Sequence, residues 1–221
     1  MKLLNEFTEE EKISFKKGQE IMTNMLKEFV DICNENSIKY WLMGGTLMGT
    51  ILNKGWLAHD GRIDIGMLEQ DYEDLEGIID NNLSTDCWFQ CRSNDSNYKL
   101  KTGKVRYLRA FYKDDNNKEF HNGLEINITL FQDRRKFFVP LADLSITMIN
   151  SEMIFPLKTL KFETIDVSVP HNYEVFNKFF NEDYPSPDLP TDKLYSPEGR
   201  ISFDIPEWIT AKYTSLYNSN Q

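Results

Sequence analysis

Residues 44–67 read GGTLMGTILNKGWLAHDGRIDIGM and decide the fold of this 221-residue chain. The apolar run IKYWLM at 38–43 leads into this stretch and is typical of a short buried strand. Residues 46–52 are apolar with small side chains and indicate a helix that ends at a turn. Alternation over residues 62–67 predicts the next strand. The segment therefore predicts strand, helix and strand in succession.

Similar patterns predict the elements on either side of this segment. Thr8 and Glu11 form a capping-box pattern at the start of an amphipathic helix over about residues 8–34. The polar stretches between the later elements contain the residues that favour turns. The remaining predicted elements are helices over 71–80 and 172–181, strands over 87–92, 99–112 and 124–132, and a hairpin within 153–170.

This order of elements predicts an α+β fold in which helices flank one mixed β-sheet. We expect residues 1–135 to form the core and residues 136–221 to form a C-terminal extension of hairpin and helix packed on that core. The two parts are expected to make one compact unit. The proline-bearing residues from 185 onward are expected to wrap the surface as a tail.

Charge and hydropathy exclude several classes of protein. The formal net charge is −10, and the chain has no continuous basic stripe, which argues against a nucleic-acid partner. No run approaches the roughly 20 apolar residues that span a bilayer. The first residues, MKLLNEFTEEEK, lack the apolar core of a signal peptide, so we expect a cytoplasmic location without a membrane span.

The three cysteines do not indicate a disulfide framework. Cys33 is far from Cys87 and Cys91, whose CWFQC spacing is not a zinc-ribbon pattern. A zinc site that combines Cys87, Cys91 and His121 is the alternative, but its spacing departs from known zinc motifs. Mostly buried thiols are therefore expected.

Two features of the 44–67 segment suit phosphate chemistry. Gly44, Gly45 and Thr46 form a strand-to-helix turn that lets the backbone approach a phosphate at a helix N-terminus. Mg²⁺ prefers one or two carboxylates together with substrate phosphates, and two acids at positions i and i+2 of a strand share one face. Asp64 fits the second of these positions, but Arg62 occupies the first.

Further oxygen ligands are available nearby. Asp60 lies four residues before Asp64 and reaches the site only from a loop, whereas Glu125 and Asn127 share one face of a later strand. Each signal also has a plain structural interpretation. The Gly-Gly-Thr turn is often only a turn, Asp64 can pair with Arg62, and Glu125 with Asn127 can form a solvated strand face.

One local group of cations stands out from the acidic background. It has two interpretations: a solvated strand face, or a contact to a donor or acceptor phosphate. Its members are Lys99, Lys101, Lys104, Arg106 and Arg109.

Together these motifs resemble the LicD family, which includes bacterial phosphocholine transferases and the eukaryotic fukutin and fukutin-related proteins. The hallmark of that family reads roughly GTLLGxxRxxxxIPWDxDxDIGM. The resemblance covers about residues 38–190, and its two ends are independent of each other. The matching stretches are Gly45 to Gly49, Ile63 to Met67, Asp71-Tyr72, Phe155 to Leu157, Phe162-Glu163, Val167 to Pro170, Tyr173 and Tyr184.

The resemblance implies a nucleotidyltransferase-like core, Mg²⁺ and a CDP-linked donor. The implied reaction moves a phosphocholine- or polyol-phosphate-type group onto a glycan acceptor. If the roles of the matching family positions apply here, the donor phosphates lie beside Gly44, Gly45 and Thr46, and Asp64 ligates the metal. Asn127, or Glu125, takes the place of a third acid. The implied partners are therefore a CDP-linked small-molecule donor and a glycan acceptor.

The chain departs from the family pattern at the metal site. Leu52 replaces the arginine of GxxR, Ala58-His59 replaces Pro-Trp, and the acids read Asp60-Gly61-Arg62. Two interpretations remain open. In the first, the enzyme is active, with Asp60, Asp64 and Glu125 holding the metal or with Arg62 binding phosphate. In the second, catalysis is lost and a ligand- or partner-binding module, a pseudoenzyme, remains.

Overall fold

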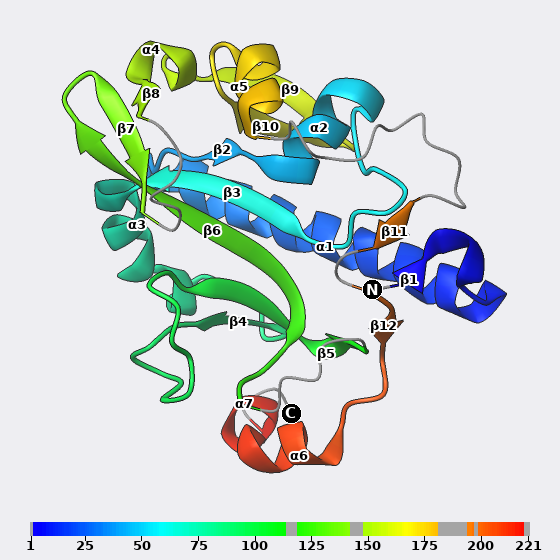
Figure 1. The fold of residues 1–221 in the computed structure, drawn as a ribbon. Coiled ribbons are helices and arrows are strands. Elements are labelled where there is room, and N and C mark those ends of the chain that lie inside the picture. The colour runs from blue at the N-terminus through cyan, green and yellow to red at the C-terminus, as the bar shows by residue number, and fades with distance from the viewer. Residues whose placement is uncertain (1, 114–118, 142–147, 181–193, 197–198, 219–221) are drawn as a thin grey trace.

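The computed structural model describes residues 2–113, 119–141, 148–180, 194–196 and 199–218. Its helices and strands form an α+β fold, in which strands β4 to β8 follow one another and the helices lie mainly before and after them (Figure 1). The α-helices are α1 (Glu9–Glu35), α2 (Gly44–Asn53), α3 (Glu69–Glu76), α4 (Ser151–Ile154), α5 (Tyr173–Phe180), α6 (Glu207–Lys212) and α7 (Thr214–Asn218). The strands are β1 (Lys2–Leu3), β2 (Trp41–Leu42), β3 (Ile63–Leu68), β4 (Cys87–Gln90), β5 (Lys104–Tyr112), β6 (Gly123–Arg134), β7 (Phe137–Pro140), β8 (Ile149–Asn150), β9 (Lys158–Phe162), β10 (Ile165–Val169), β11 (Tyr195–Ser196) and β12 (Ile201–Ser202).

The main sheet is mixed, as the sequence predicts. Its strands run in the order β12-β5-β6-β3-β2, with β4 added beside β5 and β7 and β8 added beside β6. The central pair β3 and β6 is parallel, whereas β2, β5 and β7 pair antiparallel to their neighbours. Helices flank this sheet, so the predicted fold class is confirmed at the level of a mixed α+β architecture.

Helix α1 crosses one face of the sheet (Figure 1). It begins with the predicted capping box, in which the Thr8 hydroxyl accepts from the Glu11 N–H at 3.2 Å and Glu11 accepts from the Thr8 N–H at 2.9 Å. The apolar side chains spaced along α1, from Met22 to Cys33, are buried. They pack in one hydrophobic core with the apolar side chains of β3 and β6, such as Ile63 and Ile126.

Helices α2 and α5 and the β9–β10 hairpin lie together along the β2 edge of the sheet (Figure 1), where α2 contacts β3 and β10 contacts β2. The hairpin strands pair from Ile165 opposite Phe162 to Val169 opposite Lys158. Phe155, just before β9, packs edge-on against Trp41 with ring centroids 6.0 Å apart. The division of the chain at residue 135 into core and extension stays a prediction.

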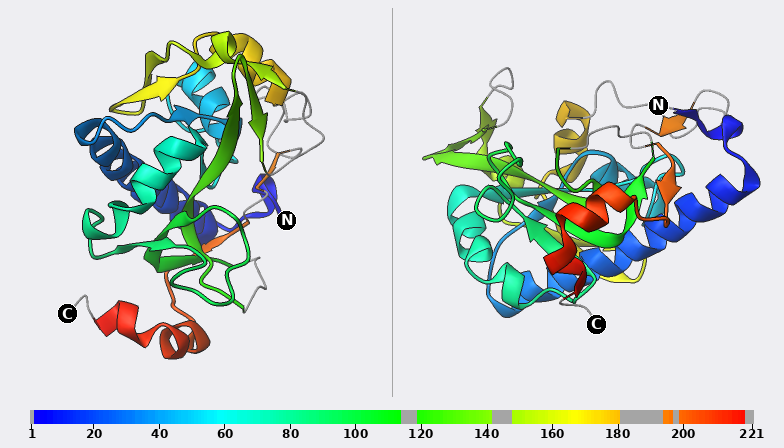
Figure 2. Two further views of the ribbon diagram at one scale, coloured as in Figure 1. Left: turned by 90° about the vertical axis from the view of Figure 1, so that its left-hand side faces the viewer. Right: turned by 90° about the horizontal axis from the view of Figure 1, so that it is seen from below.

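The C-terminal residues differ from the expected surface tail. Helices α6 and α7 pack on β4 and β5 and form a second hydrophobic cluster, whose members are Trp88, Leu108, Phe111, Ile209, Tyr213 and Tyr217. Strand β11 pairs with β1 near the start of the chain, and β12 extends the main sheet beside β5 (Figure 2). The prolines mislead here because Pro206 starts α6 instead of excluding a helix. The part of the tail over residues 181–193 lies outside the described residues.

None of the helices that the structure describes combines the length and the apolar character that a bilayer span requires.

Gly66 allows β2 to lie close to β3. A Cβ atom at this position would lie 2.3 Å from Trp41 Nε1 and 2.8 Å from Met43 Sδ, and Trp41 is completely buried. We expect Gly66→Ala to lower the free energy of unfolding by about 1–3 kcal/mol, because the indole must move within a packed core. Urea unfolding monitored by fluorescence measures the loss.

Gly77→Ala is the matched control. Gly77 caps α3 with φ −68°, and an added Cβ would meet ordinary contacts, the nearest at 3.6 Å. We expect this variant to be neutral or stabilising by up to about 1 kcal/mol. Equal losses in the two variants would contradict the close packing of Trp41 on Gly66.

Candidate functional site

Strand β3 places Asp64 next to the start of α2. The Met43 N–H donates to the Asp64 carbonyl at 3.0 Å, and the Asp64 N–H donates to the Thr46 hydroxyl at 3.0 Å. The Thr46 hydroxyl in turn donates to the Arg62 carbonyl at 3.4 Å. Thr46 is buried, so it joins the first turn of α2 to β3.

Gly44 brings the first turn of α2 against the Asp64 carboxylate. Its φ is +54°, and a Cβ atom there would lie 3.0 Å from Asp64 Oδ2. Both the left-handed backbone and the close approach therefore favour glycine. The carboxylate sits where the positive end of the helix dipole favours negative charge. The Gly-Gly-Thr turn thus contacts Asp64 and fixes its position. The contact of this turn with donor phosphates stays a prediction.

Arg62 and Asn127 both contact the Asp64 carboxylate. Arg62 Nε donates to Oδ1 and Oδ2 at 3.2 Å each, and Asn127 Nδ2 donates to Oδ1 at 3.0 Å. Asp64 and Asn127 are directly opposite in the parallel β3–β6 register. The Arg62 side chain is 42% exposed, so water screens this ion pair and it contributes little to stability. The pairing of Asp64 with Arg62, left open by the sequence, is present.

Glu125 lies on the same face of β6 as Asn127, but it pairs with Lys104 and Arg106 and not with Arg62. Lys104 Nζ donates to Glu125 Oε1 at 2.8 Å, and Arg106 donates Nη1 to Oε2. Burial alone would raise the pKa of Glu125, but Arg106 and Lys104 outweigh it and lower that pKa to about 2. Burial lowers the pKa of Lys104. Glu125 is therefore the anionic half of a buried ion pair, not an uncompensated carboxylate.

A chain of hydrogen bonds connects Arg106 to the C-terminal helices. Arg106 Nε donates to Gln90 Oε1 at 3.0 Å, and Gln90 Nε2 donates to Asp95 Oδ2 at 2.8 Å. The Tyr213 hydroxyl of α6–α7 donates to the same Asp95 oxygen at 2.6 Å. Nearby, burial and the charge of Arg106 lower the pKa of His121 to about 3. These long-range partners have no local sequence signal.

The loop before β3 carries Asp60 and is held from two sides. Gln19 Nε2 of α1 donates to the carbonyls of Leu57 at 3.1 Å and Asp60 at 2.8 Å. The Tyr112 hydroxyl of β5 donates to the Gly61 carbonyl at 2.8 Å. Asp60 is 2% exposed. Sequence reasoning missed Gln19 and Tyr112, which act across 41 and 51 residues.

The predicted metal site is not a preformed cluster of protein ligands. Among the residues that the structure describes, no group of three or more His, Cys, Asp and Glu side chains is placed to hold a metal ion. Asp60, Asp64 and Glu125 therefore do not form a protein cage, and neither do Cys87, Cys91 and His121. All three cysteines are thiols, as expected. A Mg²⁺ ion held by one or two carboxylates and substrate phosphates stays a prediction.

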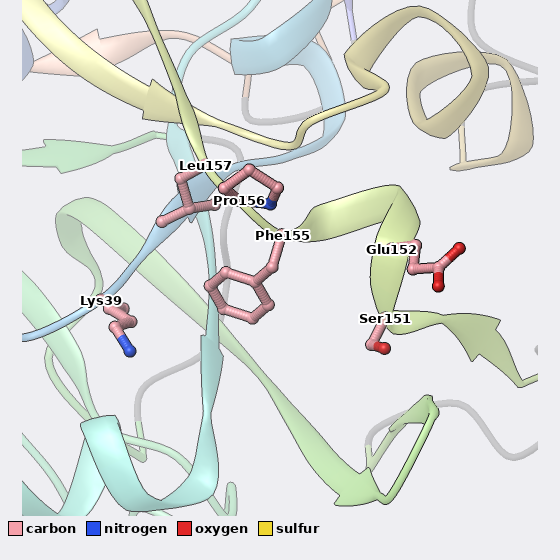
Figure 3. Close-up of a pocket in the computed structure, with 6 residues that line it drawn as sticks. All are labelled: Lys39, Ser151, Glu152, Phe155, Pro156 and Leu157. Atoms are coloured by element: carbon pink, nitrogen blue, oxygen red, sulfur yellow. The ribbon is translucent and has the colours of Figure 1, made fainter.

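A surface pocket of about 640 Å³ lies away from Asp64 (Figure 3). Figure 3 shows the Phe155 ring between Lys39 and the residues Ser151 and Glu152 of α4, and Lys39 Nζ lies 5.8 Å from the ring centroid. Residues 155–157 of the family-like motif line this pocket. Because the Phe155 ring also packs on Trp41, we interpret this part of the motif as structural.

The buried pair of Arg106 and Glu125 gives a prediction about stability. We expect Arg106→Met to lower the free energy of unfolding by about 3–5 kcal/mol, because Glu125 would keep a buried charge that has lost its main partner. The double variant Arg106→Met/Glu125→Gln should recover part of this loss. Urea unfolding at neutral pH measures both.

Arg109→Met is the control for the loss of one guanidinium. Arg109 pairs with Asp86 at 3.2 Å, with side chains 39% and 50% exposed. We expect a loss below about 1 kcal/mol for this surface pair. Similar losses for Arg106→Met and Arg109→Met would contradict a stabilising role of the buried pair.

Three known proteins are similar to parts of this chain. An uncharacterized protein of Rickettsia typhi is 22% identical over 213 residues, which are 94% of this chain and 52% of that protein. The lipopolysaccharide cholinephosphotransferase LicD of Haemophilus influenzae is 30% identical over 93 residues, 42% of this chain and 31% of that protein. An uncharacterized protein of Rickettsia prowazekii is 31% identical over 77 residues, 35% of this chain and 29% of that protein. The chain thus spans about half of the first relative and less than a third of the other two.

The family match extends over most of the fold. The sequence model described as LicD/FKTN/FKRP, nucleotidyltransferase domain, matches residues 37–172, from the turn before β2 to the residue before α5. This range contains Gly44, Asp64, Arg106 and Glu125, and it is more than half of the chain. The chain therefore belongs to the LicD/FKTN/FKRP nucleotidyltransferase-domain family.

Proposed function

We propose that this chain is a phosphotransferase domain with a nucleotidyltransferase-like core. It would move a phosphocholine- or polyol-phosphate-type group from a CDP-linked donor to a glycan acceptor. Family membership supports the reaction class, and the similarity to a protein named lipopolysaccharide cholinephosphotransferase supports the type of donor and acceptor. The observation that carries the proposal is the seating of Asp64 at the start of α2, beside Arg62.

Transfer of a substituted phosphate depends mainly on positioning and on neutralising negative charge. The face formed by β3, β5 and β6 carries the cations Arg62, Lys104 and Arg106, together with the carboxylates Asp64 and Glu125. Arg62 is the most exposed of these cations, and its planar guanidinium suits bidentate contact with phosphate oxygens. In this proposal Arg62 turns from Asp64 towards the donor and neutralises part of its charge.

Mg²⁺ is part of the proposal as a ligand that arrives with the donor phosphates. Asp64 would hold it, with Asp60 as the second carboxylate, since Mg²⁺ commonly uses one or two protein carboxylates and substrate oxygens. Its contribution would be charge neutralisation at the phosphates. Asn127 would keep the Asp64 carboxylate oriented through its 3.0 Å hydrogen bond.

The second candidate is a catalytically degenerate LicD-type module that binds a ligand or a partner. The Arg62–Asp64 ion pair favours it, because a guanidinium sits where the family pattern has an acid. A cation beside a divalent ion at about 4 Å costs several kcal/mol at an effective dielectric constant near 20. In this candidate, Arg62 neutralises Asp64 permanently and no metal binds.

The transferase proposal predicts metal-dependent nucleotide binding. We expect calorimetric titration to show that wild-type protein binds CDP-choline more tightly with Mg²⁺ than with EDTA. Asp64→Asn should weaken the Mg²⁺-dependent binding about tenfold or more, because a charged ligand is lost. Asp86→Asn, a surface carboxylate paired with Arg109, is the control and should bind as wild type does. Equal affinity for CDP-choline in Mg²⁺ and in EDTA would contradict the proposal of a metal-dependent transferase.

Substitution of Arg62 separates the two candidates. If Arg62 binds the donor phosphate, Arg62→Gln should weaken CDP-choline binding about tenfold. If Arg62 instead blocks a degenerate metal site, Arg62→Asp should increase the affinity for Mg²⁺ alone by about tenfold or more. Titrations of both variants with CDP-choline and with Mg²⁺ show which pattern holds. Unchanged Mg²⁺ affinity in Arg62→Asp counts against the degenerate site.

A further inference from the structure

A gap in the sheet opens along one edge of β6, next to Asn127. Strand β5 pairs with β6 only as far as Asn127, and β7 pairs with the end of β6. Between them, the Ile128 carbonyl accepts from the Thr102 hydroxyl at 2.9 Å, and the Leu130 carbonyl accepts from the Leu141 N–H at 2.9 Å. Residues two apart on a strand present their backbone groups to the same edge. The loop after β4 and the end of β7 therefore flank the same gap.

This gap is a pocket of about 430 Å³. Its volume falls in the range of small-molecule sites, and it mixes polar, cationic and apolar side chains. The pocket belongs to a different part of the surface from that in Figure 3. The described residues that line it are Arg92, Lys99, Leu100, Lys101, Thr102, Asn127, Ile128, Thr129, Leu130 and Leu141.

The described lining contains three cations and no carboxylate. Arg92 donates Nε and Nη2 to the Lys99 carbonyl, which fixes the plane of the guanidinium. Lys99 Nζ donates to the Ser96 carbonyl at 2.6 Å, and Lys101 is exposed beside it. On a chain with net charge −10, such a group is a local exception that attracts anions.

The pocket adjoins the candidate site through Asn127. This residue lines the pocket and also donates to Asp64 at 3.0 Å. Lys104 is opposite Asn127 in the β5–β6 register and binds Glu125. An anion in the pocket would therefore lie one side chain away from Asp64, between the Lys99–Lys101 loop and the cations of the sheet.

We propose that this pocket binds a phosphate group of the substrate through Arg92, Lys99 and Lys101, with Asn127 and Thr129 as polar contacts. The phosphate belongs either to the diphosphate of the nucleotide donor or to a phosphorylated acceptor. This place in a reaction rests on the proposed function, whereas phosphate binding itself does not require the transfer reaction or a metal.

Titration calorimetry of the full chain with pyrophosphate in EDTA tests the pocket directly. We expect wild-type protein to bind, and Lys99→Gln/Lys101→Gln to bind about tenfold more weakly or worse, because two cationic contacts are lost. The control Lys16→Gln/Lys27→Gln removes the same charge from α1, on the other face of the sheet, and should change affinity by less than about twofold. The four lysines are exposed, so thermal unfolding should match wild type.

Competition then identifies the source of the phosphate. If saturating CDP-choline prevents pyrophosphate binding, the pocket takes the donor diphosphate; if both bind together, it takes the acceptor phosphate. No pyrophosphate binding at millimolar concentration, or equal affinity in the two double variants, would overturn the proposal. A failure of the proposed function shows elsewhere, as CDP-choline binding that does not respond to Mg²⁺.

Discussion

The parallel register of β3 and β6 sets Asp64 opposite Asn127, and the polar side of the sheet is built around this pair. Alternation along both strands sends their apolar neighbours towards α1 and their polar side chains to the other face of the sheet, where Asp64 meets the start of α2. The close approach of Gly44 then fixes where the carboxylate lies relative to the first turn of the helix. A shift of one residue in this register would turn the polar side chains of the shifted strand into the core.

Charge compensation distinguishes this face from a preformed metal cage. Asp64 contacts Arg62, and Glu125 contacts both Lys104 and Arg106. Two carboxylates with three cations favour the arrival of an anion more than that of a bare cation. In the proposed transferase, a substrate phosphate and a metal ion would therefore bind together, each reducing the electrostatic cost of binding the other.

Local patterns suffice for much of the fold. The capping box and spacing of α1, the alternation of β3 and the helical pattern of α5 are each visible in short windows and are present in the structure. The site is only partly visible in this way. Residue types identify Asp64, Arg62, Glu125 and Asn127, but which of them pair depends on strand register. The docking of α6 and α7 depends on apolar contacts with distant strands, which no local window contains.

The hydrogen bonds that run from Tyr213 through Asp95 and Gln90 to Arg106 make the family segment incomplete as a physical unit. The family match ends at residue 172, yet Tyr213 from beyond that boundary supports the guanidinium that neutralises Glu125. Gln19, before the match begins, likewise supports the Asp60 loop. Exchange of the family segment alone between homologues would therefore carry this face of the sheet without two of the side chains that hold it in place.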